Sequence, residues 1–135
     1  MTADVITILN RINRKDSASG LDEWRKTVLH NIEYKVKCNT SVNGTTVNIG
    51  QSFTVLIPFD DMYMPYSEWV LNPSDGYTVS QNDMIIIGHA VDDDVAPENI
   101  VKIKAQYAPN VCNVRSILEV PNKNNARYRF LIEGV

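Results

Sequence analysis

The stretch that most constrains the fold is residues 76–94, GYTVSQNDMIIIGHAVDDD. Its central run, MIII at residues 84–87, is apolar throughout, as in a strand that is covered on both faces. The polar residues 81–83 before this run have the composition of a tight turn. Residues 77–80 alternate apolar and polar side chains, which indicates another strand. The stretch therefore predicts a hairpin in the core of a β-rich domain.

Alternation of apolar and polar residues predicts further strands along the chain. Residues 4–12 also have helical spacing, but their Ile and Thr residues favour a strand. Residues 23–38 predict a strand with one buried face, and residues 52–59 a strand that ends at Pro58, which has no N–H to donate. The last two strands are predicted over residues 111–120, with Cys112, Val114, Leu118 and Val120 on one face, and over residues 127–133, with Tyr128, Phe130 and Ile132 facing inward.

Three loops are expected to project from the domain, near residues 13–22, 39–51 and 60–75. Asn43-Gly44 is a strong signal for a two-residue hairpin turn. Residues 39–50 therefore predict a weakly apolar ribbon, which is either a contact arm or an ordinary exposed hairpin. Residues 60–75 hold Met, Tyr and Trp residues and one expected helical turn. Such a loop either packs over its own core or meets a partner.

One short helix is predicted near residues 96–107. Pro97 suits the first helical position, and Ile100, Ile103 and Tyr107 recur at helical spacing. Alternation over residues 101–105 is a competing strand signal. The whole chain, residues 1–135, therefore predicts a single mainly β domain, a small antiparallel barrel or sandwich with one short helix.

Composition excludes several classes of partner and compartment. The net charge of −3 argues against a broad basic face that grips nucleic acid. Cys38 and Cys112 belong to no metal-binding motif, and we expect them to be free thiols in a reducing cytoplasm. No segment has the apolar length of a membrane span or the pattern of a signal peptide, so no membrane partner is expected.

Few side chains are candidates for catalysis, and none has the neighbouring groups that a catalytic mechanism needs. His30 and His89 are the only histidines, and no spacing supplies a nucleophile and an orienting acid for either. Residues 92–94, with Asp60 and Asp61, could in principle hold a cation, but a calcium-loop pattern is missing. We interpret the triple aspartate as a solvated turn. The sequence predicts no catalytic residue, no cofactor and no metal site, hence no enzyme.

The order of these segments resembles a family of small structural proteins from phages and prophages of Gram-positive bacteria. The resemblance runs from Asp4 to about Val120 through DVITILNR, EWRKTVLHNIEY, FTVLIPF, YMPYSEW and YTVSQNDMIIIGHAVDDD. In that family a V-x-IPF strand precedes a Tyr…Trp loop and a T-L-x-x-GD-x-I-V-x-G strand pair. Here Asn82-Asp83 replaces the Gly-Asp of the turn, and Asn also tolerates left-handed backbone angles.

The resemblance implies a non-enzymatic virion protein of the head–tail interface, a neck component of the head-closure or tail-terminator type. It implies a homo-oligomeric ring that is assembled in the host cytoplasm and meets neighbouring connector and tail proteins. DNA would pass through such a mildly acidic ring without being gripped. The alternative is a monomeric β-barrel binding module, for example for carbohydrate, that uses the loop with Tyr63, Tyr66 and Trp69. The expected subunit interface comprises Tyr63, Tyr66, Trp69, Val47 and Ile49.

Overall fold

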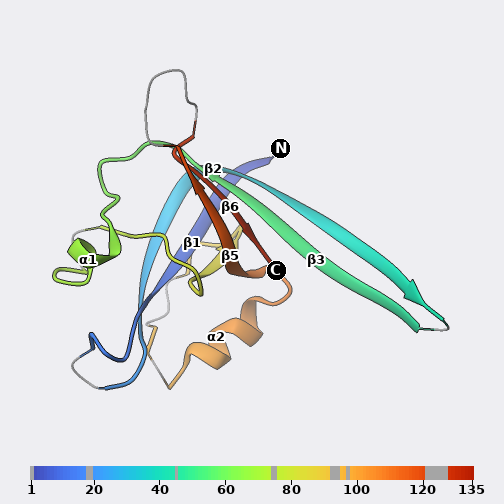
Figure 1. Cartoon of the computed structure of the whole chain (residues 1–135), viewed down its shortest axis with the longest axis horizontal. Helices are drawn as coiled ribbons and strands as arrows, with labels where there is room; N and C mark the ends of the chain where they lie inside the picture. Colours follow the sequence, from blue (N-terminus) through green and yellow to red (C-terminus); the bar gives the residue numbers. More distant parts are fainter. Residues whose placement is uncertain are drawn as a thin grey trace.

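Six strands close into one antiparallel barrel, in the order β1-β2-β3-β6-β5-β4. The structure is a computed structural model, and it describes residues 2–17, 20–44, 46–73, 76–91, 95–96, 98–120 and 128–135. The mainly β fold with a short helix near residues 96–107 is thus confirmed (Figure 1). Its elements are β1 Thr2–Ile12, β2 Glu23–Asn43, β3 Thr46–Ile57, α1 Tyr66–Trp69, β4 Met84–Ile87, α2 Ile100–Tyr107, β5 Val111–Glu119 and β6 Phe130–Gly134.

Strand β4 is apolar at every position because it faces two hydrophobic clusters. Ile85 and Ile87 point into the barrel, where they join inward residues of the other strands. Met84 and Ile86 point outward into a second cluster that α2 covers through Ile103. Both faces of the short strand are therefore removed from water, as the sequence predicts. Neither helix of the described chain has the length and apolarity to cross a membrane.

Helix α2 packs on the outside of the barrel with the predicted face. Ile103 is buried, and Ile100 and Tyr107 are partly buried against the same cluster. The helix begins at Ile100, after the N-cap Asn99; Pro97, which was expected at the first helical position, lies outside the described residues. The Asn99 side chain accepts a hydrogen bond from the Ala96 N–H (2.7 Å) and closes the turn before the helix.

The predicted hairpin of residues 77–87 is wrong in its first half. Strand β4 pairs with β1 on one side and with β5 on the other, so no edge remains for residues 77–80. These residues run extended, with only one bridge, between Tyr77 and Tyr63. The turn itself is confirmed, since Asn82 adopts the left-handed φ of 71°.

A β-bulge in β5 reverses the predicted alternation of that strand. The register with β6 shifts between Val114 and Ser116. Beyond the shift, Ile117 packs against the core, and the side chain of Leu118 is 61% exposed. The prediction that Leu118 shares the buried face of Cys112 and Val114 is therefore wrong, because one extra residue turns every following side chain to the opposite face.

Strands β2 and β3 continue far beyond the barrel as a two-stranded ribbon (Figure 1). Their pairing runs from Glu33↔Leu56 to Asn43↔Thr46. The predicted hairpin is confirmed, but its two-residue turn begins at Gly44, one residue later than the predicted Asn43. In the described chain, β1 pairs with β2 only as far as Tyr34, and β6 pairs with β3 only from Phe53. The ribbon beyond these residues therefore has no third strand.

Gly134 is a closely packed position of the barrel wall. A Cβ atom at this position would clash with the Cys112 thiol and with the Asn113 carbonyl. We expect Gly134→Ala to lower the free energy of unfolding by about 1–3 kcal/mol, because the added methyl group overpacks a closed site. Urea unfolding measures this change. The neighbouring exposed variant Glu133→Ala should change it by less than about 0.5 kcal/mol, and equal effects of the two variants would contradict the account.

Candidate functional site

Trp69 is the buried anchor of the loop of residues 60–73. Its side chain is 0% exposed, and its indole N–H donates to the Gly76 carbonyl oxygen (3.0 Å). Helix α1, which positions Trp69, is a single turn that begins after Pro65. Trp69 therefore offers no surface to a partner in this structure, and the loop packs over its own core.

We expect Trp69→Ala to lower the free energy of unfolding by about 3–5 kcal/mol, because it removes a fully buried aromatic side chain. Thermal or urea unfolding measures the loss. Leu71→Ala, which truncates a side chain that is 84% exposed two residues away, should change stability by less than about 0.5 kcal/mol. A Trp69→Ala protein as stable as the wild type would show that the loop does not depend on this side chain.

Tyr66 connects the same loop to the turn after β1. Its hydroxyl oxygen accepts a hydrogen bond from the Asn13 N–H (3.0 Å) and donates one to the Asp16 carboxylate (2.9 Å). Burial is the main cause that raises the pKa of Tyr66, so the hydroxyl stays protonated and able to donate. Two of the loops that the sequence expects to project, near residues 13–22 and 60–75, are thus joined to each other.

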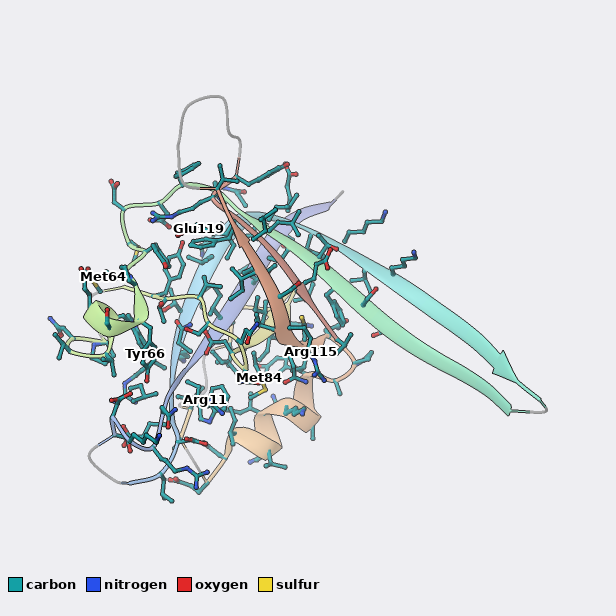
Figure 2. The ribbon with its side chains drawn as sticks, in the orientation of Figure 1. Arg11, Met64, Tyr66, Met84, Arg115 and Glu119 are labelled. Carbon is teal, nitrogen blue, oxygen red and sulfur yellow. The ribbon has the colours of Figure 1, made fainter. Side chains whose placement is uncertain are left out.

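Tyr63 belongs to a different cluster, around Arg129. The guanidinium carbon of Arg129 lies 4.3 Å from the centre of the Tyr63 ring and 5.5 Å from that of Phe130. Glu119 lies 3.8 Å from the same guanidinium group. Figure 2 shows Glu119 at the upper end of the barrel and Tyr66 beside α1, lower in the view. The three aromatic residues expected to form one interface therefore divide into two places.

The sequence shows Arg129 only as an outward residue of the last strand. Its aromatic contacts come from residues that are distant in sequence, including Phe59 at 5.9 Å. Alternation along a strand reports which face a residue occupies, but it does not report what a neighbouring loop brings to that face. Cation–π contacts of this kind contribute about 0.5–2 kcal/mol and here hold Tyr63 over the barrel end.

A hollow of about 550 Å³ lies at the same end of the barrel. Apolar side chains line it together with His30, Arg129 and two aspartates. These aspartates, Asp60 and Asp61, come just after Pro58 ends β3. The lining residues are Val28, Leu29, His30, Ile32, Ile57, Pro58, Phe59, Asp60, Asp61 and Arg129.

Asp83, like Arg129, has a structural role that the sequence pattern does not reveal. The carboxylate is buried, and it accepts hydrogen bonds from the Asn10 side chain (2.8 Å), the Arg11 N–H (2.9 Å) and the Ser80 N–H (2.9 Å). Asn10 also donates to the Thr78 carbonyl oxygen and accepts from the Thr78 N–H (3.3 Å). This buried pair replaces the missing strand pairing of residues 77–80 and attaches them to β1.

Burial raises the pKa of the Asp83 carboxyl from 3.8 to about 6, although the donors from Arg11, Asn10 and Ser80 oppose the rise. The folded chain therefore binds a proton in the window from 3.8 to about 6, where the unfolded chain has lost it. Proton binding by Asp83 therefore stabilises the folded chain fully at pH values below this window, and the stabilisation is lost as the pH rises through the window.

We expect wild-type protein to lose stability relative to Asp83→Asn, by up to roughly 3 kcal/mol, as the pH rises from about 4 to about 7. Urea unfolding of both proteins at several pH values measures this difference. The other carboxylates are the same in the two proteins, so their contributions cancel. A difference that stays constant or changes in the opposite direction would contradict the assignment to Asp83.

The remaining candidates do not gather into a reactive site. His89 is exposed, and its ring lies at a tilt against that of Tyr107, with ring centres 5.3 Å apart. Burial raises the pKa of the Cys112 thiol to about 12, which leaves it inert. No three His, Cys, Asp or Glu side chains within the described ranges are grouped closely enough to hold a metal ion. Residues 92–94 lie outside those ranges.

The other expected interface residues, Val47 and Ile49, lie on β3 in the ribbon. Their backbone register is described: Val47 pairs with Val42, and Ile49 with Thr40. Their side chains, like that of Cys38, lie outside the part of the chain whose side chains the structure describes. The structure therefore places these two residues on one strand of the ribbon, far from the loop that holds Trp69.

The chain belongs to a family of unknown function, DUF6751, whose model matches residues 1–129. No curated protein and no solved structure matches the chain. The match therefore covers the ribbon, the loop of residues 60–73 and every barrel strand except β6, but it assigns no role to any residue.

Proposed function

We propose that this DUF6751 protein is a non-enzymatic structural protein of a phage virion, a neck component of the head-closure or tail-terminator type. Copies form a homo-oligomeric ring at the head–tail interface. Two lines of reasoning support this proposal: the order of segments that resembles such proteins, and the long ribbon that leaves a small closed barrel. The ribbon is the observation that carries the proposal.

The ribbon is physically incomplete in a single copy. A two-stranded hairpin is at best marginally stable in water, and a third strand or a packed partner stabilises it. A chain that builds a well-packed barrel gains little from such an extension unless another molecule covers it. Contacts between two different surface patches repeat around a rotation axis and close into a ring, which is the form expected of a neck component.

The proposed partners and location follow from the same role. The ring meets neighbouring phage connector and tail proteins in the virion, after assembly in the host cytoplasm. A net charge of −3 suits a channel through which DNA passes, since a basic lining would retain the polyanion.

The alternative, a monomeric carbohydrate-binding module, has less support. Its platform would need Tyr63, Tyr66 and Trp69 on one exposed surface. Trp69 is fully buried, and Tyr63 lies in the separate Arg129 cluster. No specific observation favours this second function over the first.

Mass spectrometry of purified phage particles tests the proposed function. We expect the protein in particles from a strain that carries its gene, at a copy number comparable to other neck proteins. Electron microscopy after deletion of the gene should show heads and tails that are not joined. Particles that lack the protein and remain joined would overturn the proposal.

A further inference from the structure

The ribbon has two open edges. Of the residues beyond the barrel, 37–43 of β2 and 46–52 of β3 pair only with each other among the described strands. Each edge runs for about 20–25 Å at the usual rise of a strand. Edges of this length present rows of backbone N–H and C=O groups that can pair with another chain.

The position of the turn determines which residues of the ribbon direct their backbone N–H and C=O groups away from the partner strand. Asn43 and Thr46 are the last pair before a two-residue turn, so they form a hydrogen-bonded pair within the ribbon. Because hydrogen-bonded and non-hydrogen-bonded pairs alternate, every second pair directs its N–H and C=O groups away from the ribbon. The outward residues are Cys38, Thr40 and Val42 on β2 and Val47, Ile49 and Gln51 on β3.

These edges lack the usual protection against pairing. Natural proteins place charges or prolines on exposed edges, yet residues 38–52 contain no Asp, Glu, Lys, Arg or Pro. They contain instead six β-branched residues, the types that favour strands. Val36, whose pair with Phe53 is the last before the ribbon leaves the barrel, is 41% exposed. The ribbon is therefore suited to pair rather than to remain single.

Other strand edges in the described chain are less suited. Residues 23–31 of β2 precede its register with β3, which begins at Glu33, but they include Glu23, Arg25 and Lys26. In β5, residues 116–119 have no partner on the side of β4, and this stretch ends at Glu119, which is paired with Arg129. Among these edges, only those of the ribbon have a long uncharged stretch, which runs over residues 38–52.

We propose that the ribbon of one copy pairs edge to edge with the ribbon of a second copy, β3 of one against β2 of the next. The inference rests on the proposed ring, since it names the contact that would join its subunits. In a ring whose ribbons run along the rotation axis, every copy keeps the same strand directions, so this pairing is antiparallel like the pairing inside each ribbon. Each copy offers one β3 edge and one β2 edge, which allows the contact to repeat and the ring to close.

Two variants at Ile49 test whether the backbone of the β3 edge makes the contact between copies. Ile49→Pro removes an outward N–H group that the ribbon itself does not use, and Ile49→Val keeps it. A second variant replaces residues 38–51 by Asn-Gly, which joins the existing pair Lys37↔Ser52 through a two-residue turn. It leaves in place every core residue that the structure describes.

Size-exclusion chromatography with light scattering, from about 10 μM to about 1 mM protein, measures association across the range of weak contacts. We expect wild type and Ile49→Val to reach multiples of the monomer mass, whereas Ile49→Pro and the shortened variant stay monomeric with the thermal stability of the wild-type barrel. Amide hydrogen exchange should show protection of residue 49 in wild type that grows with concentration.

A wild-type protein that is monomeric throughout this range would overturn the inference. So would an Ile49→Pro protein, or a shortened protein, that associates as wild type does, since contact would then lie elsewhere on the molecule. These outcomes are separate from the proposed function, because mass spectrometry detects the protein in particles whichever surface joins its copies. Absence from particles would remove the virion role and leave ribbon pairing to be measured on its own.

Discussion

The barrel depends on one four-residue strand, β4, because it closes the sheet. It pairs with β1 on one side and with β5 on the other, and both of its faces are buried. Without β4, the first and fifth strands of the sheet would be open edges. Closure has a cost, since residues 77–80 have no sheet edge to join. The buried pair of Asn10 and Asp83 gives these residues their backbone partners instead.

Most strands could be predicted because their signal is local. Alternation in residues 52–57 reports directly which side chains are buried, and Phe53, Val55 and Ile57 are in the core. The Asn-Gly pair likewise reports a hairpin from two residues alone. The failures have non-local causes. Which strand takes an edge of β4, and where β5 bulges, depend on contacts between residues that are distant in the chain.

The candidate site, like the fold, could be predicted from the sequence only in part. Aromatic residues in a loop have the same composition whether they pack inward or face a partner, so the sequence left both interpretations of Tyr63, Tyr66 and Trp69 open. The bond from the Trp69 indole to Gly76 decides this for Trp69 and could not be read from residue types. Arg129 and Asp83 were missed because their importance comes from neighbours that only the fold supplies. The ribbon was visible in advance, but its length beyond the third strand was not.

The continuous register of β2 and β3 has a consequence for how the chain can vary. The same two strands form the ribbon and part of the barrel wall, from Asn43↔Thr46 to Glu33↔Leu56. An insertion in one strand alone would slip the register and turn Phe53 and Val55 out of the core. Insertions of equal length in both strands would move only the tip. The length of the ribbon can therefore change by equal insertions or deletions in β2 and β3 while the barrel stays the same.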